Sequence, residues 1–155
     1  MLVYRISLTK YANVLAVSGR AARWNSNGVF MIYSAASVAL ACLENVVHRN
    51  GVDLSAGDFS LVSIEVPETE VAEVALAELE NLHTEWYKVD NNAYLQTQQM
   101  GDKWTEKKET LLMKVPSSIS PYEYNYLINP HHSDFSKVRI VSQQKFVFDS
   151  RIKGL

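Results

Sequence analysis

The sequence predicts a single α+β domain that covers residues 1–155. A chain of 155 residues fits one hydrophobic core better than two. Short runs of apolar and β-branched residues alternate with stretches that have the 3.6-residue period of amphipathic helices. Only four prolines and six glycines occur, which argues against a low-complexity or disordered chain. No internal repeat is visible, so one mixed unit is the simplest organisation.

Composition excludes several classes of function. The net charge of −2 gives no electrostatic reason for direct binding to nucleic acid or to an anionic membrane. No window approaches the roughly 20 apolar residues of a membrane span, and residues 1–19 lack the pattern of a signal peptide. The lone cysteine, Cys42, cannot form an internal disulfide. We therefore expect a cytoplasmic protein with no membrane partner.

Two strands are predicted near the N-terminus. Leu2–Leu8 alternates weakly, which places Tyr4 and Arg5 on opposite faces of a strand. The Asn-Ser-Asn-Gly sequence at residues 25–28 is typical of a turn. Val29–Tyr33 is a continuous apolar run of the kind that forms a buried strand.

A helix is predicted next, capped by Ser34 or Ser37, running to about Arg49 and closed by Asn-Gly at residues 50 and 51. Its apolar residues fall at the spacing of one buried stripe. They are Ala36, Ala39, Leu40, Leu43, Val46 and Val47. Glu44 lies about 100° from the centre of this stripe. This carboxylate is therefore expected at the edge of the core.

The second half of the chain is less regular. Leu61–Val66 alternates as a half-buried strand and ends at Pro67, and Glu68–Leu82 has the spacing of a helix with glutamates on its solvent face. Trp86–Lys108 is irregular, and a connection of that length suggests a loop that lines a site. Further short apolar runs are Leu111–Val115, Tyr126–Ile128, Val138–Val141 and Phe146–Phe148.

Familiar catalytic motifs are missing from the sequence. It contains no phosphate-binding loop, GxGxxG, GxSxG or paired-cysteine metal motif. His48 and His83 are isolated and residues 131 and 132 are adjacent histidines, which is poor spacing for a metal site, so no metal is expected. Cys42 fits a small core residue better than a nucleophile.

Several polar residues have two interpretations each. The segment Arg23-Trp24-Asn25 fits a surface turn with the tryptophan packed inward, and Tyr33 fits a core aromatic with a solvated hydroxyl. Glu44 fits an exposed helix residue, and Ser117 fits a turn. Each of these residues also has the chemistry of a site residue, although composition alone favours the surface turn for the Arg23 segment.

The order of short motifs along the chain favours the functional interpretation. These motifs are Tyr4-Arg5, Gly19 with Arg23-Trp24-Asn25 and Gly28, Tyr33, Glu44, Thr97-Gln98, Gly101-Asp102 with Trp104, Val115-Pro116-Ser117, Asn125, Asn129-Pro130 with His132, and Phe148-Asp149 with Arg151. In this order they resemble the RES-domain toxins of bacterial toxin–antitoxin systems, a family named for an arginine, a glutamate and a serine. The resemblance spans nearly the whole chain.

The resemblance implies an ADP-ribosyltransferase-like fold, a mixed sheet core with flanking helices. It also implies a toxin that uses NAD+ as its substrate and cleaves the nicotinamide–ribose bond. The ADP-ribose passes to water or phosphate, or in the alternative to a cellular protein. A cognate Xre-type helix-turn-helix antitoxin is the implied partner. A module that binds NAD+ without cleaving it, or one whose pocket has decayed, is the rival interpretation.

Each candidate residue has a role within this resemblance. Glu44 is expected to stabilise the cationic ribose of the transition state. Arg5 and Arg23 have the planar donors that suit the pyrophosphate, and Tyr33 is expected to order the nicotinamide ring. Ser117 is a candidate hydrogen-bond partner of the substrate or of Glu44.

Two features of the sequence concern the loop that contains Arg23. Asn25 accompanies Arg23 in the RWN motif and is a candidate for NAD+ binding. Residues 20–22 are Arg-Ala-Ala where the family pattern has a glycine directly before the arginine of this motif. The loop is therefore expected to differ in shape, or to share the phosphate contact between Arg20 and Arg23.

Overall fold

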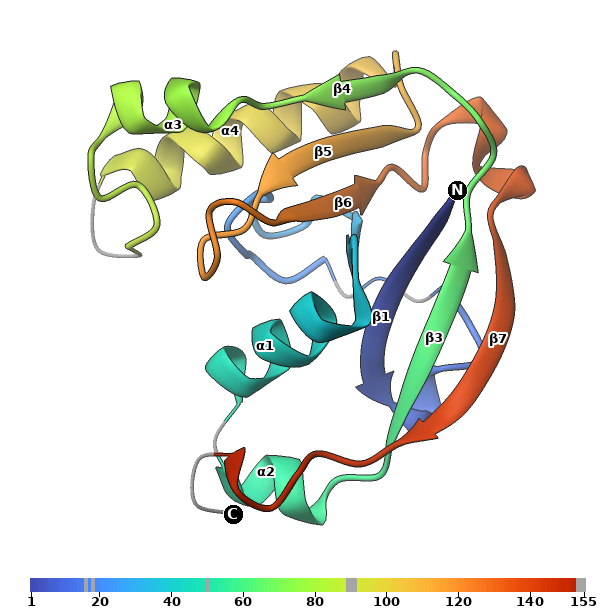
Figure 1. Ribbon diagram of the computed structural model, residues 1–155. Helices are drawn as coiled ribbons and strands as arrows, with labels where there is room; N and C mark the ends of the chain where they lie inside the picture. Colours follow the sequence, from blue (N-terminus) through green and yellow to red (C-terminus); the bar gives the residue numbers. More distant parts are fainter. Residues whose placement is uncertain (16, 18, 50, 89–91, 153–155) are drawn as a thin grey trace.

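The computed structural model describes residues 1–15, 17, 19–49, 51–88 and 92–152. Within these ranges seven strands form one mixed sheet (Figure 1). The strands are β1 (Leu2–Leu8), β2 (Ile32–Ala35), β3 (Phe59–Glu65), β4 (Val71–Glu73), β5 (Leu112–Pro116), β6 (Tyr124–Ile128) and β7 (Arg139–Phe146). Their spatial order is β4-β5-β6-β2-β1-β3-β7, with β4 and β5 parallel and every other neighbouring pair antiparallel.

Helices flank both halves of this sheet. They are α1 (Val38–His48), α2 (Gly51–Ala56), α3 (Leu76–Leu82) and α4 (Asn92–Lys107), with 3₁₀ helices at Thr9–Tyr11 and Ser133–Lys137. In Figure 1, α3 and α4 accompany β4 and β5, whereas α1 and α2 lie beside the half that contains β1, β3 and β7. None of the helices within the described ranges has the length and apolar character to cross a bilayer. The predicted α+β class, a mixed sheet with flanking helices, is confirmed.

The sheet opens between β1 and β2. These strands share a single register pair, Tyr4 with Ala35, whereas β1 and β3 share seven. The two halves therefore diverge from this junction, as Figure 1 shows. Each half has its own apolar cluster, one centred on Trp24, Trp86 and Trp104 and the other on Phe59 and Phe148 with Leu40 of α1. A third cluster crosses the junction, because Val3 of β1 and Val62 of β3 belong to the same buried group as Ile32 of β2 and Ile128 of β6.

Two predicted elements are confirmed closely. The strand Leu2–Leu8 is β1. The predicted helix is α1, and of the two candidate caps the structure selects Ser37, whose hydroxyl accepts a 3.1 Å hydrogen bond from the Leu40 amide. The helix ends at His48 with Arg49 as its C-cap. Asn50 lies outside the described residues, and Gly51 begins α2, which the sequence pattern did not predict.

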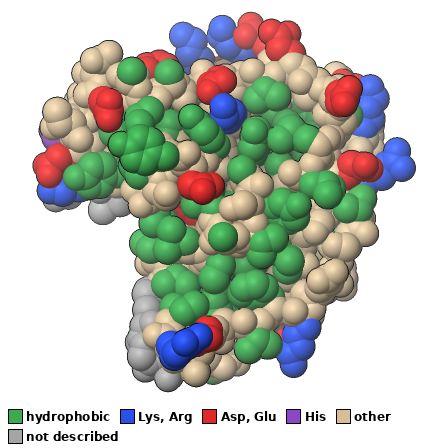
Figure 2. All heavy atoms as spheres, in the orientation of Figure 1, with side chains coloured by type: hydrophobic (Ala, Val, Ile, Leu, Met, Phe, Trp, Pro, Cys, Tyr) green, Lys and Arg blue, Asp and Glu red, His purple; other side chains and the backbone are tan. Residues whose placement is uncertain are grey.

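The burial predicted for α1 is only partly right. Leu40 and Ala41 are buried, but Ala39, Leu43 and Val47 are exposed. The helix is rotated so that its contact face centres on Leu40 and Ala41. Figure 2 shows apolar side chains at the surface of this part of the molecule.

Three further predictions are corrected by pairing between distant segments. The strand predicted at Val29–Tyr33 begins later, as β2 at Ile32–Ala35. The predicted helix Glu68–Leu82 is wrong in its first half, because residues 71–73 pair in parallel with β5, and only Leu76–Leu82 is helical. The runs at Val138–Val141 and Phe146–Phe148 are not separate strands, since β7 continues from Arg139 to Phe146 along β3.

The predicted loop Trp86–Lys108 is wrong over most of its length. Residues 92–107 form α4, while residues 89–91 lie outside the described ranges. The buried face of α4 contains polar and small residues, among them Thr97, Gln98 and Gly101. This composition hides the apolar period by which an amphipathic helix is recognised.

Candidate active site

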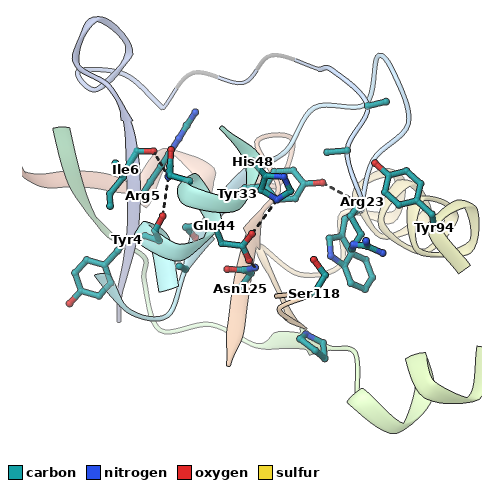
Figure 3. A pocket seen from close by; sticks show the side chains of 18 residues that line it. Tyr4, Arg5, Ile6, Arg23, Tyr33, Glu44, His48, Tyr94, Ser118 and Asn125 are labelled. Atoms are coloured by element: carbon teal, nitrogen blue, oxygen red, sulfur yellow. Dashed lines mark hydrogen bonds and ion pairs between the residues drawn. The ribbon is translucent and has the colours of Figure 1, made fainter. Parts of the chain in front are cut away.

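A cavity of about 480 Å³ lies where the sheet opens between β1 and β2 (Figure 3). Its volume is within the usual range for sites that bind small molecules. The walls come from β1, β2, α1, the loop at residues 21–24, the start of α4 and the β5–β6 connection. Arg5, Arg23, Tyr33 and Glu44, four of the predicted site residues, line it together.

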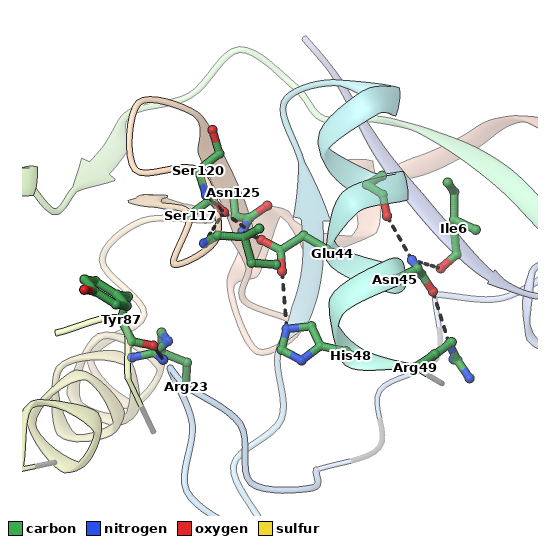
Figure 4. Close-up of polar contacts among 12 residues, drawn as sticks. Ile6, Arg23, Glu44, Asn45, His48, Arg49, Tyr87, Ser117, Ser120 and Asn125 are labelled. Atoms are coloured by element: carbon green, nitrogen blue, oxygen red, sulfur yellow. Dashed lines mark hydrogen bonds and ion pairs between the residues drawn. The ribbon is translucent and has the colours of Figure 1, made fainter. Parts of the chain in front are cut away.

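Glu44 lies on α1, and both oxygens of its carboxylate have partners. Its Oε1 accepts hydrogen bonds from Ser117 Oγ at 3.0 Å and from Asn125 Nδ2 at 2.6 Å, and its Oε2 lies 3.3 Å from Nε2 of His48 (Figure 4). Burial alone would raise the pKa of Glu44, but the hydrogen bonds from His48, Asn125 and Ser117 lower it below its usual value. The structure therefore keeps a half-buried carboxylate ionised at the cavity wall.

Ser117 lies behind Glu44 and is fully buried. Its hydroxyl oxygen accepts from the amides of Ile119 at 3.1 Å and Ser120 at 3.2 Å, which directs its own proton toward Glu44. Its neighbour Ser118 lines the cavity instead. Of the two roles considered for Ser117, the observed contact is with the carboxylate.

Arg23 is held by the segment that precedes α4. Its Nη1 donates to the Trp86 carbonyl at 2.7 Å and its Nη2 donates to the Tyr87 carbonyl. The guanidinium carbon also lies 5.6 Å from the centre of the Trp86 ring and 5.1 Å from that of Tyr94, both within cation–π range. Desolvation lowers the pKa of Arg23, and the same cause lowers that of Arg5 on β1. Arginine remains charged through such shifts, so two desolvated cations line the cavity.

Tyr33 and Asn25 form one hydrogen-bonded unit. The Tyr33 hydroxyl donates to Asn25 Oδ1 at 2.7 Å and accepts from the Trp24 amide at 3.1 Å. Burial, the largest cause, raises the pKa of Tyr33. Asn25 is only 2% exposed, and its Nδ2 donates to the carbonyls of Arg20 and Val29 at 2.8 and 3.0 Å. Asn25 thus lies behind the cavity wall, where it ties together both ends of the loop that contains Arg23.

Replacing Asn25 with alanine is expected to destabilise the protein by about 2–3 kcal/mol, since the change removes several hydrogen bonds of a buried side chain and leaves partly buried groups unpaired. The Tyr33 hydroxyl and the Arg20 and Val29 carbonyls each lose a partner. Thermal unfolding of the variant measures the loss. The control is Asn81→Ala, an exposed residue of α3, for which no comparable loss is expected. A wild-type melting temperature for the Asn25 variant would contradict this structural role.

Three residues at the site were assigned no role on the basis of the sequence. Asn125 stood in the motif series, but its contact with Glu44 depends on the pairing of β6 with β2. His48 follows Glu44 by four residues, a helical spacing that brings side chains together and was a usable signal. Tyr94 belongs to the segment predicted to be a loop. The described residues contain no group of three or more metal-binding side chains.

Comparison with known proteins identifies the family. The sequence-family model of the RES domain matches residues 2–149. The chain belongs to the RES-domain family. A RES relative from Photorhabdus laumondii, named Toxin Res, is 35% identical and covers 98% of this chain and 97% of its own length. A second relative, from Sphingobium, is named Prs ADP-ribosylating toxin and is 39% identical over 84% of this chain and 79% of its own length.

The RES-domain fold also has a solved counterpart. A chain in the crystal structure of the M. tuberculosis MbcT–MbcA toxin–antitoxin complex superposes with a TM-score of 0.76 at 12% identity. The match covers 99% of this chain and 89% of that one. At this level of identity the likeness establishes a shared fold.

Proposed function

We propose that this RES-domain protein is the toxin of a bacterial toxin–antitoxin system and that it cleaves the nicotinamide–ribose bond of NAD+. The observation that supports this proposal is the ionised carboxylate of Glu44 in a cavity that also contains Arg5, Arg23 and Tyr33. The names of the relatives, Toxin Res and Prs ADP-ribosylating toxin, agree with a toxin of this kind.

The chemistry of the bond requires a negative group at this place. When the bond between C1′ of the ribose and the pyridinium nitrogen breaks, the electron pair leaves with nicotinamide, and the ribose acquires oxocarbenium character. A carboxylate that accepts a hydrogen bond from a ribose hydroxyl stabilises that charge more in the transition state than in the ground state. Glu44 takes this role, and Ser117 and Asn125 hold it in position.

The two arginines suit the opposite charge of the substrate. A pyrophosphate binds best to charge-assisted donors in a planar fork. Arg5 and Arg23 both line the cavity, although two donors of Arg23 are already bonded to backbone carbonyls. In this proposal both arginines contact the pyrophosphate, and Tyr33 forms the wall for the nicotinamide.

Replacing Arg5 with alanine is expected to raise KM for NAD+ by about 10- to 150-fold, the equivalent of one charge-assisted hydrogen bond of roughly 1.5–3 kcal/mol. Because this contact exists before and during the reaction, kcat changes less. Steady-state kinetics measure both constants. Arg139→Ala, on the exposed edge strand β7, is the matched control. An unchanged KM would remove Arg5 from the binding site.

A second candidate is transfer of ADP-ribose to a cellular protein. The name of the Sphingobium relative, at 39% identity, specifically favours this acceptor. Both candidates break the same bond and differ only in what attacks C1′. The partner in either case is a cognate antitoxin, a proposal supported by the toxin–antitoxin complex that shares this fold, and the Xre type of that antitoxin is what the family resemblance implies.

Incubation of the purified protein with NAD+ tests the proposal. Three reactions are compared: buffer alone, inorganic phosphate, and a lysate protein fraction, with products identified by mass. Free ADP-ribose indicates water as the acceptor, its phosphorylated form indicates phosphate, and a labelled protein indicates a transferase. Saturable NAD+ binding with no release of nicotinamide in any reaction would leave a non-catalytic binding module.

A further inference from the structure

The two oxygens of the Glu44 carboxylate have different surroundings. Oε1 accepts from Ser117, which is fully buried, and from Asn125 on β6. Oε2 faces Nε2 of His48 at 3.3 Å, and both residues line the cavity (Figure 3). Oε1 is therefore the more firmly fixed oxygen, whereas Oε2 is paired with the exposed ring of His48.

Of the three side chains that contact the Glu44 carboxylate, His48 is the easiest to move. The side chain of His48 is 69% exposed, compared with 21% for Glu44. His48 is the last residue of α1, so little packing restrains its ring. Ser117, in contrast, is held by two backbone amides. Because the imidazole of His48 is largely exposed to solvent, its pairing with Glu44 at positions i and i+4 is weak, so His48 can leave Oε2 at small cost.

We propose that His48 covers Oε2 of Glu44 in the free protein and that a ribose hydroxyl of NAD+ must displace it, which makes substrate binding dependent on pH. This inference rests on the proposed function. A hydroxyl can donate to Oε2 only where the imidazole has moved away. His48 is thus a competitor for the carboxylate and acts on binding rather than on bond cleavage.

The sign of the pH dependence follows from the charges in the cavity. A protonated imidazole binds a carboxylate more strongly than a neutral one, because the hydrogen bond is then charge-assisted. The other ionisable groups that line the cavity are Tyr4 and Arg5 of β1, Arg23, Tyr33 of β2, Glu44 and Tyr94 of α4. The two arginines remain charged, burial raises the pKa of Tyr33, and the lowered pKa of Glu44 keeps it ionised. Acidification therefore strengthens the cover and weakens substrate binding.

The test compares the wild type with His48→Ala and His48→Gln from pH 5.5 to 8.5. For the wild type, KM for NAD+ is expected to be about two- to fivefold higher at pH 5.5 than at pH 8.5, the range typical of an exposed ion pair. Both variants are expected to have a lower KM that varies little with pH, with kcat within about twofold of the wild type. Val47→Ala, on the exposed side of the same helix, should keep the wild-type profile.

Binding of ADP-ribose, measured by calorimetry at pH 5.5 and 8.5, gives a readout without turnover. The same loss of pH dependence is expected in both His48 variants. The proposal is overturned where the variants keep the wild-type pH profile of KM and of ADP-ribose affinity. It is equally overturned where kcat falls tenfold or more with KM unchanged, because His48 then acts in the chemistry. A wild type that binds ADP-ribose with this pH dependence but never cleaves NAD+ contradicts the proposed function and leaves the role of His48 intact.

Discussion

Replacing Glu44 with glutamine is expected to lower the rate of NAD+ cleavage by at least about 100-fold, the usual effect of removing one electrostatic stabiliser of a transition state. Glutamine keeps the size of the side chain and can still accept from Ser117 and Asn125 through its carbonyl oxygen. It loses the negative charge that the developing ribose cation needs. The effect should therefore fall mainly on kcat.

The measurement is nicotinamide release under saturating NAD+, together with growth after induced expression. Glu44→Gln should reduce growth arrest in proportion to its loss of activity, and Glu44→Ala should do the same. Glu80→Gln, an exposed residue of α3, serves as a matched control because it makes the same chemical change away from the cavity. Full activity and full toxicity of both Glu44 variants would falsify the central role assigned to this residue.

Replacing Gly101 with alanine is expected to destabilise the protein by roughly 2–3 kcal/mol, the cost of overpacking a well-filled interior. A Cβ atom at this position would overlap the Trp24 carbonyl oxygen and lie 2.9 Å from the Trp24 carbonyl carbon. Both obstacles are backbone atoms, which cannot move aside as a flexible side chain can. Either α4 or the loop containing Arg23 and Trp24 must shift.

Thermal unfolding should show a melting temperature lower by about 4–12 °C, given the usual 2–4 °C per kcal/mol for a chain of this size. NAD+ cleavage should fall as well, because the displaced loop contains Arg23 and bonds Tyr33. Lys103→Ala, on the exposed side of α4, is the control for an alanine on the same helix. A wild-type melting temperature for Gly101→Ala would show that the contact can relax.

The parts of the fold that the sequence predicted well are those encoded locally. Strand β1 and helix α1 follow from alternation, from the 3.6-residue period and from a serine cap. The family resemblance, which rests on the order of the motifs, predicted that Arg5, Arg23, Tyr33 and Glu44 share one site, and all four line the cavity. Their roles in catalysis and binding stay predictions until they are tested.

The parts that were missed depend on partners far away in the chain. Thr97 donates to the Arg23 carbonyl and Gln98 to the Ala22 carbonyl, across 74 and 76 residues. These bonds, together with the packing of Ala93 and Trp104 in the cluster that contains Trp24, attach α4 to the loop at the cavity. Residues 71–73 are a strand because β5 lies beside them, although their spacing suits a helix. Local periodicity contains no information about either pairing.

The interleaved strand order affects how the site forms while the protein is synthesised on the ribosome. Glu44 is synthesised early, but the two donors that fix its Oε1 follow 73 and 81 residues later, and β2 gains its neighbour β6 only with them. A nascent or truncated chain that stops short of β6 therefore lacks a finished carboxylate site. On the proposed function, the activity would arise only after β6 has been synthesised and has paired with β2.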